Sequence, residues 1–119
     1  MSTVVRAISI RQPYVELILR GEKREEYRSR ATRIRERVYL YASLTPSEWP
    51  EDWQEVGKQK GELPTGKLVG TVEVTDCYWH KRHKCYAYVL SEPERLPTFL
   101  KPNNQPQPGF WRPQFAGAL

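Results

Sequence analysis

The sequence predicts an α+β fold, a small β-barrel of five to six strands with two or three short helices. Its segments of alternating apolar and polar residues are short, turn residues separate them, and they are too few for a β-sandwich. Only two segments carry the start signals of a helix. The length of 119 residues is that of one domain, so we expect residues 1–119 to fold around one core.

The first half of the chain alternates short strands with one helix. Residues 4–8 are β-prone, and a Gln-Pro pair predicts a helix over 13–20, because proline at the first helical position loses no hydrogen bond. Gly21 is expected to end that helix as its cap. Residues 25–30 and 37–43 alternate as strands do, with a charged loop between them.

The second half is organised around one long hairpin. A capping-box sequence, T-P-S-E, predicts a short or broken helix within 46–60. Residues 67–77 are the clearest strand, and Gly70 inside it predicts a bulge or tight bend. The hairpin loop is expected at 78–84 and the returning strand at 85–90.

Prolines are frequent from residue 91 onward, which predicts irregular backbone lying on the surface of the domain. Phe110-Trp111 is expected to form a last short strand within this region. We expect the segment 98–119 to pack on the rest of the domain.

The charge is concentrated in the first third of the chain. The net charge is +5, and residues 1–40 alone hold ten Lys or Arg against five Glu. Such an excess indicates a phosphate-binding surface, with a merely solvated face as the alternative. No apolar run reaches the roughly 18 residues of a spanning helix, so no membrane partner is expected.

The remaining expectations concern compartment, thiols and assembly. The first residues carry no signal-peptide core, which predicts a cytoplasmic protein. Two cysteines in that compartment predict free thiols. We expect a monomer that uses no cofactor.

One segment, G-E-K-R-E-E-Y-R, brings together side chains that can carry chemistry. Gly21 frees the chain to reverse, Lys23 lies at the turn, and Glu26 and Arg28 project to the same side of the following strand. The three charged side chains are therefore expected to converge. A structural ion-pair network is the alternative to a binding site.

The sequence resembles the ASCH (activating signal cointegrator homology) domains of the PUA-like superfamily. The resemblance rests on S-I-R-Q-P-Y at 9–14, on G-x-K-x-x-E-x-R at 21–28, on Y-L-Y-A-S at 39–43 and on L-V-G-T-V at 68–72. It implies a PUA-like barrel with a cleft beside the segment 21–28, suited to a nucleic-acid base. RNA is the expected partner, entering as a single-stranded or modified base, with a modified nucleoside as another ligand.

Two sets of residues are assigned to this site. The expected ligand-binding residues are Gln12, Tyr14, Lys23, Glu26, Arg28, Ser43 and Trp111. The arginines expected to meet the nucleic-acid backbone are Arg11, Arg30, Arg33, Arg35 and Arg37.

A small hydrolase is the alternative function. Some members of the family cleave RNA, and others remove the acetyl group from N4-acetylcytidine. The resemblance places Lys23 at a lysine that the amidohydrolase branch uses, whereas Glu26 stands where that branch has threonine. If the protein is an enzyme, Lys23 and Glu26 are therefore the expected catalytic residues, but a threonine-dependent mechanism does not carry over unchanged.

A second group of chemical residues lies in the predicted hairpin loop. Two Cys and two His occur within the nine residues 77–85, which are the ligand types of tetrahedral zinc. Zinc fingers separate their ligand pairs by a dozen or so residues, whereas these four lie on one hairpin with three basic residues among them. We therefore predict a basic hairpin loop and no metal.

Overall fold

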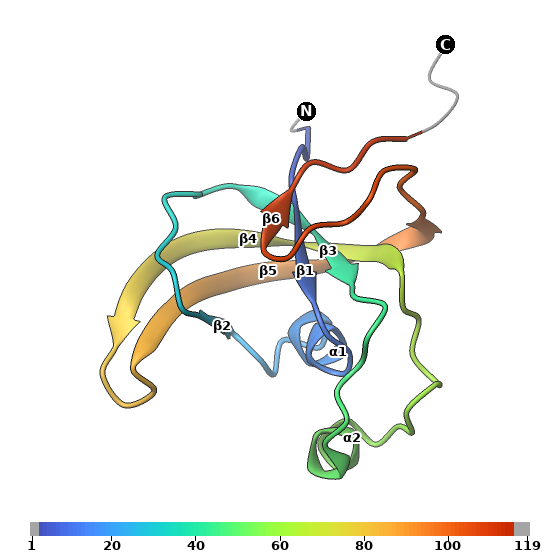
Figure 1. Cartoon of the computed structure of the whole chain (residues 1–119), viewed down its shortest axis with the longest axis horizontal. Helices are drawn as coiled ribbons and strands as arrows, with labels where there is room; N and C mark the ends of the chain where they lie inside the picture. Colours follow the sequence, from blue (N-terminus) through green and yellow to red (C-terminus); the bar gives the residue numbers. More distant parts are fainter. Residues whose placement is uncertain (1–2, 116–119) are drawn as a thin grey trace.

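The computed structural model describes residues 3–115, and it shows one six-stranded mixed sheet with two short helices (Figure 1). The elements in chain order are β1 (Ala7–Ile10), α1 (Tyr14–Leu19), β2 (Glu25–Arg28), β3 (Arg37–Ala42), α2 (Pro50–Val56), β4 (Lys67–His80), β5 (Cys85–Leu100) and β6 (Phe110–Trp111). The order across the sheet is β2-β5-β4-β3-β1-β6. Neither helix is long and apolar enough to cross a membrane, in the residues that the structure describes.

The α+β class is confirmed, but the sheet does not close into the expected barrel. Within residues 3–115, no ladder of backbone hydrogen bonds joins the two edge strands, β2 and β6. The reason lies at Ser9 of β1, whose amide donates to the carbonyl of Gly109 at 3.0 Å and whose carbonyl accepts from the Arg28 side chain at 2.7 Å. A side chain therefore spans the gap between β2 and β1 where a closed barrel would have backbone pairing.

The sheet has one parallel pair, β1 with β3, because the chain passes through α1 and β2 between them. All the other paired strands are antiparallel. Val38 and Leu40 of β3 project from the inner face of the curled sheet into the main core. The other buried members of that core are Ile8, Ile10, Val15, Ile18, Ala42, Val69, Val72, Val74, Tyr88 and Leu90.

Helix α1 lies against the inner face of the sheet (Figure 1). Its range, Tyr14–Leu19, falls within the predicted range 13–20. The peptide bond before Pro13 is cis, and the helix begins at Tyr14. Gly21 ends it with a φ of +78°, and the backbone amides of Gly21 and Glu22 donate to the carbonyls of Ile18 and Leu17. This reversal, which favours glycine, directs the next residues back toward the sheet.

Gly70 in β4 marks the bulge that the sequence predicted. The register of β4 against β5 shifts between Leu68 and Gly70. A Cβ atom at Gly70 would lie 2.5 Å from a methyl carbon of Leu19 and 2.6 Å from the backbone oxygen of Glu94. Glycine is needed here because α1 and β5 both approach the β4 backbone closely.

Two elements differ from the expectation. The helix within 46–60 begins at Pro50 and has Trp49 as its N-cap residue, with no side-chain cap, so the predicted T-P-S-E capping box is wrong. Pro50 fits the first helical position, where its missing amide costs no hydrogen bond. The helix ends at Gly57, which has a φ of +70°.

The second difference is the length of the hairpin. Strand β5 continues to Leu100 through Pro93 and Pro97, where irregular backbone was predicted, and the loop shrinks to 81–84. Proline is tolerated because β2 covers only Tyr86–Val89, which leaves the later part of β5 as an edge, and because the β4–β5 register is irregular there.

The C-terminal segment covers the outer face of the sheet. Trp111 in β6 is buried there, with its ring edge-on to that of Tyr41 at 5.2 Å. Its indole nitrogen donates to the hydroxyl of Ser9 at 2.9 Å. The expected short strand at Phe110-Trp111 is thus present, whereas residues 116–119 of the predicted packing segment lie outside the described residues.

Candidate functional site

A cleft of about 490 Å³ opens where β1 and β2 face each other across the gap in the sheet. Its walls come from four parts of the chain: β1 and the residues after it, β2, the segment after β3, and the turn before β6. The lining residues are Ser9, Arg11, Tyr14, Glu26, Arg28, Ser43, Thr45, Pro108 and Gly109.

Lys23, Glu26 and Arg28 converge beside this cleft, which Glu26 and Arg28 line. Oε2 of Glu26 accepts two hydrogen bonds from the Arg28 guanidinium, at 3.0 Å from Nε and 2.8 Å from Nη2. The Lys23 ammonium lies 3.4 Å from Oε1 of the same carboxylate. Glu26 is only 9% exposed, so the carboxylate is partly desolvated and held by two cations. The trio has a net charge of +1.

Lys23 also lies over two aromatic rings. Its Nζ is 5.6 Å from the ring centre of Tyr14 and 5.1 Å from that of Tyr27, which are cation–π distances. The three side chains border a second hollow of about 530 Å³, and Tyr14 lines both hollows. Lys23 therefore has the partners that a charged ammonium group usually has, a carboxylate and two ring faces.

The two tyrosines are fixed by carboxylates. The Tyr14 hydroxyl donates to Asp52 at the start of α2, and partial burial followed by this hydrogen bond raises its pKa. Partial burial, followed by the hydrogen bond that Tyr27 donates to Glu25, raises the pKa of Tyr27 to about 12. Both rings are therefore neutral phenols at physiological pH, available for packing and stacking.

The trio keeps donors and acceptors for a ligand. Both hydrogen bonds that Glu26 accepts within residues 3–115 end on Oε2, and Oε1 makes only the 3.4 Å contact with Lys23. Nη1 of Arg28 makes none of the hydrogen bonds described for this part of the chain, because Nε and Nη2 make them. Both residues line the cleft, so an acceptor and a charged donor with remaining hydrogen-bonding capacity are present there.

The family model of the ASCH domain matches residues 8–100. The chain belongs to the ASCH domain family. The match covers most of the chain, from β1 to the end of β5, and it includes the trio and all of the cleft walls except the turn before β6. No curated protein matched the sequence.

Three of the expected site residues lie away from the cleft of this ASCH domain. Gln12 is 1% exposed, its amide donates to the carbonyl of Pro64, and its oxygen accepts from the amide of Glu16. Trp111 packs on the outer face, as described above. Arg37 also lies on that face, where it binds the hydroxyl of Thr71 at 2.9 Å.

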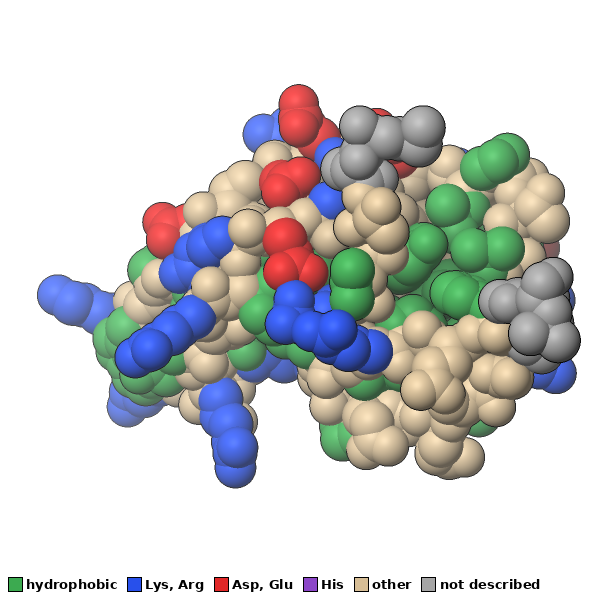
Figure 2. All heavy atoms as spheres, turned by 90° about the horizontal axis from the view of Figure 1, so that it is seen from above, with side chains coloured by type: hydrophobic (Ala, Val, Ile, Leu, Met, Phe, Trp, Pro, Cys, Tyr) green, Lys and Arg blue, Asp and Glu red, His purple; other side chains and the backbone are tan. Residues whose placement is uncertain are grey.

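Some of the other expected residues line the cleft, and the rest lie on an exposed segment of the chain. Tyr14, Ser43 and Arg11 line it. Arg30, Arg33 and Arg35 are exposed on the segment 29–36. Figure 2 shows that Lys and Arg side chains gather at the end of the molecule formed by this segment and the β4–β5 hairpin, on the left, whereas the other end of this face is mainly hydrophobic or uncharged.

Sequence reasoning missed part of the cleft wall. Ser9 and Thr45 belong to motifs that were singled out, S-I-R-Q-P-Y and T-P-S-E, but were not assigned to the site, so motif membership was the available signal. Pro108 and Gly109 reach the cleft only because β6 pairs with β1, a contact between the two ends of the chain that no local pattern predicts.

The hairpin does not assemble the metal site that its residue types allowed. His80 and His83 stack on each other with ring centres 4.3 Å apart, and Cys77 and Cys85 are free thiols. In the part of the chain that the structure describes, no three or more His, Cys, Asp or Glu side chains are grouped as metal ligands.

Proposed function

We propose that this ASCH domain binds single-stranded nucleic acid, with RNA preferred, and that a base or modified base enters the cleft beside Lys23, Glu26 and Arg28. The observation that carries the proposal is remaining hydrogen-bonding capacity at the cleft: within residues 3–115, Oε1 of Glu26 accepts no hydrogen bond and Nη1 of Arg28 donates none. A base edge presents the complementary pair, since an exocyclic amine donates and a ring carbonyl or nitrogen accepts.

The charges and rings around the trio support the same ligand. A net charge of +1 at the trio, with Arg11 on the rim and three exposed arginines on 29–36, favours a polyanion. Tyr14 borders both hollows and offers a ring to a base. An ion-pair network that served the fold alone would not need an open cleft beside it.

Binding is favoured over hydrolysis by the contacts of Lys23. The Lys23 ammonium contacts the Glu26 carboxylate and the rings of Tyr14 and Tyr27, and these are contacts of a binding group. The hydrolase alternative is nevertheless measurable, because loss of mass from an acetylated or phosphodiester substrate reports turnover directly.

The test compares wild type with Glu26→Gln and with Glu36→Gln, a control whose carboxylate pairs with Arg6 on the surface. Short single-stranded RNAs and modified nucleosides are titrated, and the same mixtures are read by mass spectrometry. We expect wild type and control to bind alike without turnover and Glu26→Gln to bind about tenfold more weakly, the cost of one charged hydrogen bond. Equal binding by all three proteins would overturn the proposal, and turnover that Glu26→Gln abolishes would establish the hydrolase instead.

A further inference from the structure

The β4–β5 hairpin extends well beyond the part of the sheet that β3 covers. The last β3–β4 pair is Arg37 with Glu73, whereas β4 continues to His80 (Figure 1). The tip is thus a ribbon of β4 and β5, and within residues 3–115 the one strand that pairs with it is β2, along Tyr86–Val89. Tyr88 of this extension belongs to the main core, and β2 of the cleft wall pairs with it, but residues 79–85 at its end belong to neither the core nor the cleft lining.

The inner face of the ribbon carries aromatic side chains in line with the cleft. Across the sheet, Arg28 is opposite Tyr86, and Tyr86 is opposite Trp79. Directly opposite residues of paired strands project to the same face, so these three side chains form one row. Arg28 lines the cleft at one end of the row, and Trp79 lies two strand spacings away, about 10 Å.

Trp79 is the exposed end of the row. Its side chain lies edge-on to Tyr86, with ring centres 5.1 Å apart and an interplanar angle of 72°. Tyr86 packs against the main core, which fixes the pair, but Trp79 remains 50% exposed. A large aromatic residue is held in place here without being buried, which is the state of a stacking platform.

Basic residues follow Trp79 closely in the chain. Lys81, Arg82 and Lys84 occupy the four-residue turn, all are exposed, and none forms an ion pair within residues 3–115. Arg30 is close to the inner face as well, because its carbonyl accepts a hydrogen bond from Tyr88 at 2.6 Å. Three exposed cations thus lie on the turn that directly follows the strand of Trp79.

We propose that the inner face of the hairpin is a second binding subsite, in which Trp79 stacks on a base that flanks the base in the cleft, while the basic turn contacts the phosphates of the same single strand. This inference rests on the proposed function, since the row begins at Arg28. The three basic residues of the turn favour a polyanion as the ligand. The exposed Trp79 ring favours a polyanion that carries bases.

The test uses two RNAs of different reach. A trinucleotide fills the cleft alone, and a single strand of about 12 nucleotides, within the range of single-strand site sizes, also reaches the hairpin. Trp79→Leu keeps an apolar contact with Tyr86 but removes the stacking face. Its matched control is Trp49→Leu, because Trp49 is 65% exposed before α2, outside the inner face.

We expect Trp79→Leu to bind the longer RNA at least fivefold more weakly, the lower end of the effect of one stacked base, and the trinucleotide as wild type does. Converting the three basic turn residues to Gln should lower the log–log salt slope by about 2, at about 0.7 for each lost phosphate contact. Converting Lys58, Lys67 and Lys101, which are exposed elsewhere, removes the same charge and should change the slope less.

The outcomes separate the two proposals. If Glu26→Gln weakens both RNAs and Trp79→Leu weakens neither, the cleft binds RNA and the hairpin subsite is wrong. If wild type binds neither RNA, both proposals are wrong. If Trp79→Leu and wild type have equal melting temperatures, a loss of binding comes from the missing ring. If Trp79→Leu melts at a lower temperature, Trp79→Phe is tested, because it retains an aromatic face. The proposed subsite is then wrong unless Trp79→Phe restores binding.

Discussion

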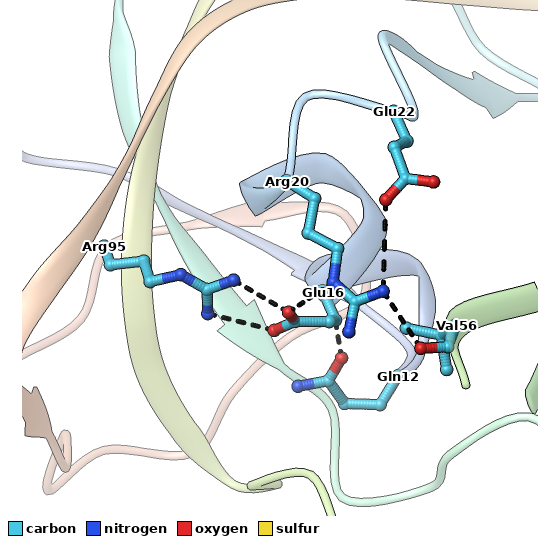
Figure 3. A network of polar contacts seen from close by, with 6 residues as sticks. All are labelled: Gln12, Glu16, Arg20, Glu22, Val56 and Arg95. Atoms are coloured by element: carbon cyan, nitrogen blue, oxygen red, sulfur yellow. Dashed lines mark hydrogen bonds and ion pairs between the residues drawn. The ribbon is translucent and has the colours of Figure 1, made fainter. Parts of the chain in front are cut away.

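Glu16 and Glu26 are both buried carboxylates that contact two cations, yet their hydrogen bonds are distributed differently. Both oxygens of Glu16 accept hydrogen bonds, whereas one oxygen of Glu26 does. Glu16 is 8% exposed and Glu26 is 9% exposed. Arg95 donates to both oxygens of Glu16, at 3.0 and 2.7 Å, and Arg20 donates to Oε2 at 2.8 Å (Figure 3). Both hydrogen bonds to Glu26 end on one oxygen instead.

The difference distinguishes a structural ion-pair network from the site that we propose binds RNA. The Glu16 network links elements that are far apart in the chain, since Arg95 lies in β5 and Arg20 donates to the carbonyl of Val56 at the end of α2 (Figure 3). In the trio, by contrast, Oε1 of Glu26 accepts no hydrogen bond within residues 3–115, and Glu26 lines a cleft. Burial and charge alone therefore do not identify a site, whereas the unsatisfied hydrogen-bonding capacity of its members does.

The largest expected effect is on stability, at Glu16. An amide can replace only one of two accepting oxygens, so Glu16→Gln turns an NH₂ group toward an arginine donor. We expect unfolding to require about 2–3 kcal/mol less free energy, below the usual loss for a broken buried pair, because the Arg95 side chain is 54% exposed. Urea denaturation measures this, and a loss below about 0.5 kcal/mol would contradict the assignment.

Gly70→Ala tests the same region through the backbone. Gly70 pairs with Arg95 in the β4–β5 ladder, so the added methyl, clashing with the backbone oxygen of Glu94, displaces the strand that brings Arg95 to Glu16. We expect a loss of about 1–3 kcal/mol, typical of overpacking. Because both changes act through Arg95, the double variant with Glu16→Gln should lose less than the sum of the two. Additive losses would indicate that Gly70 serves only local packing.

A smaller stability effect and a clear binding effect are expected at Glu26. In Glu26→Gln the amide oxygen can keep both hydrogen bonds from Arg28, so only the 3.4 Å contact with Lys23 is lost. We expect a stability loss of less than about 1 kcal/mol, with RNA affinity about tenfold lower. Calorimetry and anisotropy on one preparation give both values. If Glu26→Gln loses as much stability as Glu16→Gln and binds RNA normally, the trio is a second structural network.

The sequence could predict the Glu26 trio but not the Glu16 network, and the reason is sequence distance. Glu26 and Arg28 are two residues apart on a strand, after a glycine turn, so periodicity alone places them together. Arg95 is 79 residues from Glu16 and comes from a stretch expected to be irregular. Strand β5 beyond Leu90 depends on pairing with β4, which overrides the local preference of its prolines.

The same distinction applies to the fold. Helix α1 and strands β2 and β3 lie where caps and alternation predicted them, because both signals are local. Closure of the barrel is a long-range property, and it fails where a side chain of Arg28 takes the place of strand pairing at Ser9. The turn before β6, which completes the cleft, is likewise positioned by pairing between distant residues.

The smallest expected effect is a pH dependence carried by Glu16. The hydrogen bonds from Arg95 hold the pKa of the Glu16 carboxyl below its ordinary value of 4.5, more than burial raises it. A carboxyl with a lower pKa in the folded state adds stability above its unfolded pKa, and this contribution disappears as the pH falls through the folded pKa. The stability difference between wild type and Glu16→Gln should therefore be constant near neutral pH and shrink below pH 4.5. Glu25, whose pKa is lowered by a hydrogen bond from Tyr78, is present in both proteins, so its titration cancels in the difference.

At low pH a protonated Glu16 is a neutral group of the same shape as Gln, and the two proteins should have equal free energies of unfolding. A difference that persists undiminished to about pH 3 would mean that Glu16 contributes by packing rather than by charge, and the contrast with Glu26 would then rest on shape alone.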